Sequence, residues 1–197
     1  MRLRLAVPSD GPRLAAIYEP AVVGTTLSVE LAAPDATEMS RRVADTLTHR
    51  PWLVAEADSV LGFAYASPHR VRPAYAWSVE VTIYTAPDAH RKGLGRALYT
   101  SLFAILILQG FQNAYAGITV PNLPSSRFHE AMGFELVGTY RQVAYKLGRW
   151  IDVGWYARSL GDHPAEPART RPLPDVMRSP EFERALQAGL ISPRSSS

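Results

Sequence analysis

The run His90-Arg91-Lys92-Gly93-Leu94-Gly95-Arg96 joins a strand-like segment, 77–84, to the longest helical pattern of the chain, 93–109. Two glycines in such a turn let the backbone approach a phosphate closely, and the start of the following helix carries about half a positive charge. The two arginines and the lysine of the run add full positive charges. The run therefore predicts a site for a phosphate-bearing ligand. An ordinary glycine-containing turn before a basic helix is the alternative.

The glycine spacing argues against two common nucleotide-binding loops. The run lacks the Gly-Lys-Ser/Thr ending of a Walker loop, and it does not have the G-x-G-x-x-G spacing of dinucleotide-binding folds. Nucleotide hydrolysis and dinucleotide binding are therefore disfavoured.

The composition of the chain is that of one globular domain. It has 197 residues, of which 47% are hydrophobic and 20% charged, enough for an adequate core. The balance of 21 basic and 18 acidic side chains gives a net charge of +3, which is too small to indicate a nucleic-acid surface. There is no run of about 18 apolar residues and no signal-peptide pattern. We therefore expect a cytoplasmic protein without membrane or nucleic-acid partners.

Cysteine is absent from the sequence. Disulfides, cysteine-based metal sites and an acyl-enzyme on a cysteine thiolate are therefore excluded. We expect no bound metal, and we expect any acyl transfer to proceed by direct attack.

Periodicity along the chain predicts alternating strands and helices. Apolar residues recur at helical spacing in 10–21, 35–47, 93–109 and 125–132. β-rich runs predict strands over 2–7, 52–56, 60–66, 77–84, 111–119, 134–140 and 153–157. Prolines in a polar stretch predict an extended, Pro-rich C-terminal tail over 161–197, with a candidate short helix at 180–190. We therefore expect one domain over 1–160, followed by a tail.

The order of these elements resembles that of the GNAT acetyltransferases. Members of that family carry the motif Q/R-x-x-G-x-G/A in the loop before the longest helix. Here the motif reads His90-Arg91-Lys92-Gly93-Leu94-Gly95, with histidine where glutamine or arginine is usual. The resemblance implies an α/β (α+β) GNAT fold, with a central mixed, mostly antiparallel sheet of about seven strands flanked by about four helices. It also implies acetyl-CoA as the acetyl donor.

Four further stretches resemble the phosphinothricin and methionine sulfoximine N-acetyltransferases. They are PWLVAE (51–56), RVRPAYAWSVE (70–80), FHEAMGF (128–134) and KLGRWIDV (146–153). The resemblance extends over roughly residues 2–160 and is far more specific than the loop alone. It implies an acetyl-CoA-dependent N-acetyltransferase that acts on the α-amino group of a small amino-acid-like substrate. It also implies a homodimer.

A glutamate lies in the middle of the predicted strand 77–84. Side chains alternate between the faces of a strand, so Glu80 points away from the side on which Val79 and Val81 enter a core. From the pattern alone, a solvated edge-strand glutamate is the alternative. The resemblance assigns Glu80 to the family's catalytic glutamate. Such a base removes a proton from the substrate ammonium group, whose pKa is about 8.

The resemblance also implies roles for other residues. His129 occupies the position from which many GNAT enzymes protonate the leaving thiolate, although a surface or capping histidine has the same local pattern. The cofactor is assigned to Ile83, Tyr84, Thr85, Arg91, Lys92, Gly93, Leu94, Gly95, Arg96 and Asn122. The substrate is assigned to Arg70, Arg72, Tyr75 and Thr82, since arginine forks can hold a carboxylate or phosphinate. Solvated arginines and a turn asparagine are the alternatives.

One departure from the family pattern concerns the substrate pocket. Relatives usually place an aromatic residue where Ser28 stands, so the acceptance of phosphinothricin stays open. Two other functions fit the same motifs: N-acetylation of a peptide or protein, and a non-catalytic acyl-CoA-binding module. The presence of both Glu80 and His129 argues against the non-catalytic module.

Overall fold

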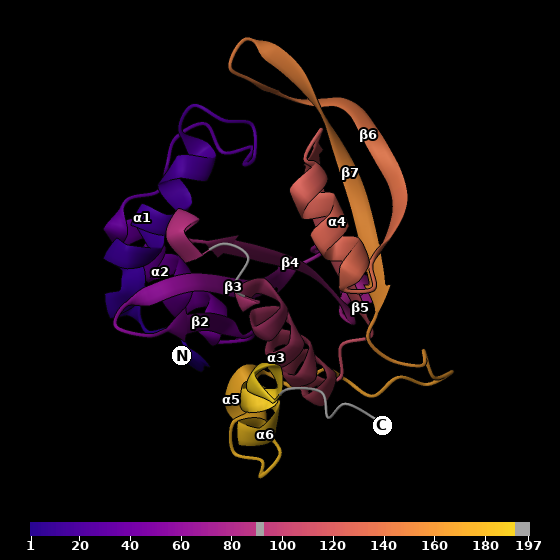
Figure 1. The fold of residues 1–197 in the computed structure, drawn as a ribbon. Coiled ribbons are helices and arrows are strands. Elements are labelled where there is room, and N and C mark those ends of the chain that lie inside the picture. Colours follow the sequence, from indigo (N-terminus) through magenta and orange to yellow (C-terminus); the bar gives the residue numbers. More distant parts are fainter. Residues whose placement is uncertain (90–92, 192–197) are drawn as a thin grey trace, which may run out of the picture.

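The structure is a computed structural model that describes residues 1–89 and 93–191 (Figure 1). In this part of the chain, seven strands form one sheet in the order β1-β2-β3-β4-β5-β7-β6, and only β4 and β5 run parallel. The strands are β1 (Arg2–Leu5), β2 (Trp52–Glu56), β3 (Val60–Pro68), β4 (Ser78–Thr85), β5 (Asn113–Val120), β6 (Glu135–Lys146) and β7 (Arg149–Ser159). The expected mixed, mostly antiparallel sheet is confirmed.

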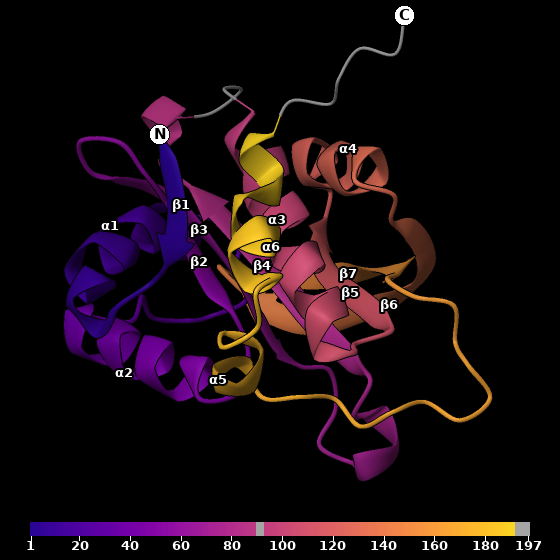
Figure 2. The ribbon, with the colours of Figure 1, turned by 90° about the horizontal axis from the view of Figure 1, so that it is seen from below.

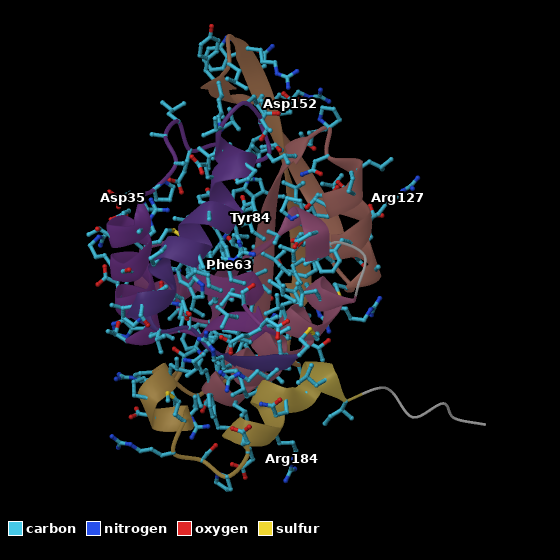
Figure 3. All side chains as sticks on the ribbon, turned by 60° about the vertical axis from the view of Figure 1, so that its left-hand side comes forward. Asp35, Phe63, Tyr84, Arg127, Asp152 and Arg184 are labelled. Carbon is cyan, nitrogen blue, oxygen red and sulfur yellow. The ribbon has the colours of Figure 1, made fainter. Side chains whose placement is uncertain are left out.

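Helices cover both faces of this sheet. On one face Tyr18 packs on Tyr84 of β4, with ring centroids 4.6 Å apart, and Figure 3 shows Tyr84 together with Phe63 in the interior. The adjacent Ile83 points to the opposite face, toward α3. Figure 2 shows α1 and α2 on one side of the sheet and α3 on the other. The flanking helices are α1 (Gly11–Val22), α2 (Ala36–Leu47), α3 (Leu94–Gln109) and α4 (Leu123–Ala131), with short 3-10 turns η1 (Pro8–Asp10), η2 (Pro73–Tyr75) and η3 (Pro87–Ala89).

The sheet opens between β4 and β5. β4 pairs with β3 over 79–85, but it pairs with β5 only over 78–80, opposite 113–115. Beyond that point β5 continues alongside β7 to Val120. The main chains of β4 and β5 therefore diverge after Glu80, which stands at the corner of the opening.

Glycines lie at both ends of α3. Gly93 precedes the helix with a φ of 74° and Gly110 follows it with a φ of 91°, a left-handed conformation that favours glycine. Most of the 16 residues between them are buried, so α3 is covered on nearly every side. Although α3 is strongly apolar, neither it nor any other described helix has the length and hydropathy of a membrane-spanning segment.

The last two strands are longer than the pattern predicts. The expected strands 134–140 and 153–157 extend to Lys146 and back to Arg149, joined by a tight turn at Leu147 and Gly148 with φ values of 51° and 75°. Together they form an arm that projects from the rest of the molecule (Figure 1). Nearly every residue of β6 is exposed. The arm therefore shows no alternation of buried apolar and exposed polar residues from which its length could be predicted.

The C-terminal segment packs against α3. After β7 it crosses the molecule without regular structure, held in part by the Trp77 Nε1–H, which donates to the Ala168 carbonyl over 2.7 Å. It then forms α5 (Leu173–Val176), α6 (Phe182–Gln187) and the 3-10 turn η4 (Ala188–Leu190). Its buried apolar residues are Leu173, Val176, Phe182, Ala185 and Leu186, which belong to the main core. The division at residue 160 stays a prediction from the sequence.

Candidate active site

Glu80 lies at the corner of the sheet opening. Its side chain is 30% exposed, and it shares a face of β4 with Thr82 and Tyr84, on the side of α1. Burial raises the pKa of the Glu80 carboxyl, while the charge and hydrogen bond of Arg70 oppose that shift. The carboxyl group is thus partly desolvated and held beside a cation, an environment that suits a general base.

Two consecutive residues of the loop after β3 contact the Glu80 carboxylate. Arg70 donates from Nη1 to Oε1 over 3.0 Å, and its guanidinium lies 5.3 Å from the centroid of the Trp155 ring. The Nδ1 atom of His69 lies 3.2 Å from the same oxygen. The resemblance assigns Arg70 to the substrate, whereas in the structure one of its donors is directed at Glu80. The sequence analysis missed His69, because a lone loop histidine carries no pattern beyond its place before Arg70.

The other predicted substrate residues lie at different depths. Arg72 is exposed and precedes η2, in which the ring of Tyr75 packs against that of His69 at a centroid distance of 5.9 Å and an interplanar angle of 67°. Thr82 lies two residues beyond Glu80 on the same strand, opposite Tyr65 of β3. The structure thus brings Thr82 close to Glu80 and Tyr75 close to His69, and it leaves Arg72 facing solvent.

Ser28 fixes the loop between α1 and α2. Its side chain is buried, its Oγ lies 2.6 Å from the Tyr18 hydroxyl, and the same Oγ accepts from the Glu30 N–H. Its carbonyl accepts from Nζ of Lys146, at the end of β6, over 2.7 Å. A second bond runs from Arg149 to Thr26 over 3.2 Å, so the arm and this loop are joined. Ser28 therefore has a structural role that the sequence analysis did not foresee.

His129 is enclosed by α3, α4 and the strands of the arm. It is 4% exposed, its Nδ1 lies 2.8 Å from the Ser125 carbonyl, and its Nε2 lies 3.1 Å from the Tyr99 hydroxyl. Only an N–H can pair with a carbonyl, so Nδ1 donates and Nε2 accepts from Tyr99. Burial lowers the pKa of the His129 ring, and the Ser125 carbonyl partly opposes this. The ring is therefore held neutral in one orientation, among the rings of Phe128, Phe134 and Tyr156.

The start of α3 has space for a ligand. Chain neighbours aside, a Cβ atom built on Gly93 would meet no atom of residues 1–89 and 93–191 within 4 Å, and the left-handed φ of this residue turns the following main chain into the helix. Leu94 is buried, so only its main chain can contact a ligand there. This open helix start fits a phosphate group. His90, Arg91 and Lys92 lie outside the described residues.

The two glycines of the motif have different surroundings. A Cβ atom on Gly95 would lie 3.1 Å from the ring of Phe128, so this glycine lets α4 approach α3 closely. The next residue, Arg96, is exposed and lines a groove that also contains Arg158. The structure therefore gives Gly95 a packing role that the sequence pattern did not separate from ligand binding.

The remaining predicted cofactor residues border the opening or a helix cap. Ile83 and Tyr84 point to opposite faces of β4, and Thr85 pairs with Gly62 of β3. All three residues lie in the part of β4 that follows the last residue paired with β5. Asn122 caps α4, and its side chain accepts from the Ser125 N–H over 3.3 Å.

No cluster of three or more metal-ligating side chains occurs within residues 1–89 and 93–191.

Parallel strands that separate within a sheet present main-chain groups to an extended ligand, and a carboxylate at the point of separation can act on a group held there. This arrangement, beside a helix start open to phosphate, suits a transferase that holds an extended, phosphate-bearing ligand next to a base. Residues 3–155 match the family described as "Acetyltransferase (GNAT) domain", and the chain belongs to this family. The expected fold and the expected activity of an N-acetyltransferase that uses acetyl-CoA are confirmed.

Three similar proteins place the chain more closely within the family. A phosphinothricin N-acetyltransferase of Streptomyces coelicolor is 47% identical over 126 residues, covering 56% of this chain and 74% of the relative. An L-methionine sulfoximine/L-methionine sulfone acetyltransferase of Salmonella typhimurium is 31% identical over 170 residues, covering 85% and 99%. The solved structure of a phosphinothricin acetyltransferase from Sinorhizobium meliloti, in complex with AcCoA, is 35% identical with a TM-score of 0.79, covering 84% of this chain and 92% of that one. The resemblance inferred from the sequence is confirmed.

Proposed function

We propose that this enzyme acetylates the α-amino group of a small amino-acid-like compound of the phosphinothricin or methionine sulfoximine type. The names of its relatives support this substrate class. The observation that carries the proposal is the Glu80 carboxylate at the corner of the sheet opening, beside a loop with two arginines. We place the reaction in the cytoplasm, because its acetyl donor is an intracellular metabolite.

In this proposal Glu80 is the base. An α-amino group has a pKa of about 8 and is mostly protonated at neutral pH, so it attacks only after losing a proton. The Glu80 carboxyl, whose pKa is raised by burial, takes that proton directly or through a water. Arg70 favours the ionised form of Glu80 before the transfer. The amine then attacks the thioester directly, since the chain has no cysteine to carry the acetyl group.

His129 is the proposed proton donor to the leaving thiolate. In the free enzyme Nδ1–H donates to the Ser125 carbonyl and Nε2 accepts from Tyr99, so the neutral ring must first take up a proton at Nε2, and this proton then passes to the thiolate. Burial lowers the pKa of this ring, which makes the imidazolium form a stronger acid. The role matches the one that the sequence resemblance implies.

We propose that the start of α3 binds the pyrophosphate of acetyl-CoA. The main chain of 93–95 and the positive end of the helix supply the donors, and the exposed Arg96 adds charge. Arg91 and Lys92 stay predictions from the sequence. The main chain of 83–85 borders the opening and is the proposed site for the extended arm of the cofactor. Asn122 stays a prediction, since its side chain caps α4.

The acid group of the substrate is assigned to the loop after β3. Arg72 is exposed and has its guanidinium available for a carboxylate or phosphinate, which arginine binds through two parallel hydrogen bonds. Tyr75, which packs against His69, and Thr82, two residues beyond Glu80 on β4, complete the proposed substrate site. Arg70 contributes its charge to Glu80 and to any acid group bound nearby.

A second copy of this chain is the proposed partner of the arm. β6, the adjoining turn and the start of β7 expose many large apolar side chains in water, which a monomer rarely leaves uncovered. These side chains are Leu136, Val137, Tyr140, Val143, Tyr145, Leu147 and Trp150. The family resemblance, which implies a homodimer, supports the same conclusion.

Thiol release from acetyl-CoA tests the activity. We expect free thiol when phosphinothricin or methionine sulfoximine is added, and we expect Glu80→Gln to lower kcat about 10²- to 10⁴-fold, the contribution of a general base. The affinity of Glu80→Gln for acetyl-CoA, measured by calorimetry, should match that of the wild type. Glu19→Gln, which changes an exposed glutamate of α1, is the matched control.

Two other outcomes of this assay favour the alternative functions. Thiol release only with peptides would indicate N-acetylation of a peptide or protein. Binding of acetyl-CoA without release by any amine would indicate a non-catalytic module and would contradict the proposed roles of Glu80 and His129.

A further inference from the structure

The loop after β3 presents two donors to one oxygen of Glu80. His69 Nδ1 lies 3.2 Å from Oε1, and Arg70 Nη1 donates to the same atom over 3.0 Å. Within the described residues, no hydrogen bond is made to the other carboxylate oxygen, Oε2, and the side chain is 30% exposed. The two oxygens of one carboxylate therefore have different surroundings.

We propose that His69 is a positioning residue for Glu80. Its Nδ1–H, together with Arg70, holds Oε1, so that Oε2 is the oxygen that accepts the proton of the substrate. The proposal rests on the proposed function, in which Glu80 is the base. No motif in the sequence assigns His69 to the site.

The orientation of the His69 ring is fixed by aromatic neighbours from three elements. It stacks on Tyr115 of β5, with centroids 4.2 Å apart and an interplanar angle of 14°. Tyr75 of η2 and Trp155 of β7 approach it at 5.9 Å each, with interplanar angles of 67° and 77°. The side chain is 11% exposed. A ring packed in this way has little rotational freedom, so the direction of its Nδ1–H is set by the fold.

The ring is neutral in this setting. The charged groups that face it are Glu80 and Arg70, and the phenol of Tyr75 and that of Tyr115 are its titratable neighbours. Burial and the positive charge of Arg70 both lower the pKa of His69. Since an ionised carboxylate only accepts hydrogen bonds, the proton of the neutral ring lies on Nδ1. His69 thus adds a hydrogen bond to Glu80 without adding a second positive charge.

Two substitutions separate this role from simple ring packing. His69→Phe keeps an aromatic ring for stacking on Tyr115 and removes the donor. His69→Asn removes the ring and keeps an amide N–H close to the position of Nδ1. If His69 positions Glu80, His69→Asn should keep the wild-type activity and His69→Phe should lose it. If the ring acts only by packing, the opposite result is expected. His49→Gln, at an exposed histidine, is the control.

The first measurement is the titration of the Glu80 carboxyl in the free enzyme, followed by carbon-13 NMR. A hydrogen bond to the ionised form lowers the pKa of a carboxyl group, so His69→Phe should raise the pKa of Glu80 above the wild-type value. His69→Asn and His49→Gln should leave it unchanged. The same pKa in wild type and His69→Phe would overturn the proposal.

The second measurement is the rate with saturating acetyl-CoA. A hydrogen bond to a charged group contributes enough for His69→Phe to lower kcat about 10- to 100-fold, with the KM for acetyl-CoA unchanged. His69→Asn should stay within about threefold, and thermal melting should confirm that both variants are folded. Full activity in His69→Phe together with loss of activity in His69→Asn would show that the ring acts only by packing, and would overturn the proposal.

The failure of the proposed function can be told apart from the failure of this inference. If no amine is acetylated by the wild type, the substrate class is wrong, and the NMR titration still decides whether His69 holds Glu80. If Glu80→Gln keeps full activity, Glu80 is not the base and His69 cannot position one.

Discussion

At Glu80 and His129, burial acts on opposite charges. It raises the pKa of the Glu80 carboxyl and lowers the pKa of the His129 ring, in each case by disfavouring the charged form. A carboxylate in such surroundings gains from accepting a proton, and an imidazolium gains from losing one. The same physical effect therefore favours the base role of Glu80, and it makes His129 a stronger acid in the proposed reaction once the ring, neutral in the free enzyme, has taken up a proton at Nε2.

The rate of acetylation should depend on pH in the direction set by Glu80. The base must be ionised, so kcat/KM should fall as the pH decreases through the pKa of Glu80, which lies above the ordinary glutamate value. Arg70 favours the ionised carboxyl group, so Arg70→Gln should raise this pKa and move the loss of activity to higher pH. Initial rates across acidic and neutral pH measure both shifts. An acid limb at or below the ordinary glutamate value would contradict the assignment.

Among the elements, α3 depends on a glycine whose role is conformational. Gly93 has a positive φ, and a Cβ atom there would meet none of the described residues beyond its chain neighbours. Gly148, in the turn of the arm, has nearly the same φ of 75° and equally open surroundings. Substitution of either glycine should therefore strain the backbone to a similar extent. Only Gly93 lies at the start of α3.

Gly93→Ala is expected to weaken acetyl-CoA binding, because it disturbs the main-chain donors proposed to hold the pyrophosphate. Loss of one hydrogen bond to a charged group corresponds to about a 10- to 100-fold weaker Kd. Gly148→Ala carries similar strain and should leave the Kd unchanged. Calorimetric titration of both variants is the measurement. Wild-type affinity in Gly93→Ala would argue against the pyrophosphate site at this helix start.

For the whole molecule, the C-terminal segment completes the cover of α3. Gly189 packs so closely on the first turns of α3 that a Cβ atom would overlap the Ala97 carbonyl, and its N–H donates to Ser101 over 2.9 Å. Fully burying one large apolar side chain contributes about 1.5–3 kcal/mol. Several such side chains from 161–191 are buried here, a contribution comparable with the about 5–15 kcal/mol that stabilise a typical domain.

Removal of residues 161–197 should therefore destabilise the domain, even though the sequence places the domain boundary at residue 160. Gly189→Ala, a milder change, should cost about 1–3 kcal/mol through overpacking against α3. Urea denaturation of the full-length protein, the truncated protein and the Gly189→Ala variant measures the free energy of unfolding of each and tests both expectations. A truncated chain with wild-type stability would show that 1–160 folds without the segment.

The assembly of two copies should depend on the exposed arm. Val143→Lys places a charge on β6, where Val143 is 52% exposed, and should convert the proposed dimer to a monomer. Ile107→Lys, on α3, changes an equally apolar residue that is 51% exposed and serves as the control. Light scattering coupled to size-exclusion chromatography gives the mass of each. A monomeric wild type, or a dimer unaffected by Val143→Lys, would contradict the proposal.

The sequence by itself determined the features that depend on neighbours along the chain. The spacing of apolar residues predicted α3, and Gly93 and Gly110 lie at its two ends as their conformational freedom allows. The alternation of side chains between the two faces of the strand 77–84 placed Glu80 on the face opposite Val79 and Val81. The family motifs, which are also local, identified an acetyl-CoA-dependent acetyltransferase that the comparisons confirm.

Only the tertiary structure decided which distant side chains meet. The contact of His69 with Glu80 joins a loop to a strand, and the bond between Tyr99 and His129 joins two helices. The length of the exposed arm and the packing of α6 on α3 likewise depend on contacts between segments that are far apart in the sequence. Local periodicity reports the conformation of a segment and the face it buries. The partner that covers that face is selected by packing across the whole fold, which no short stretch of sequence encodes.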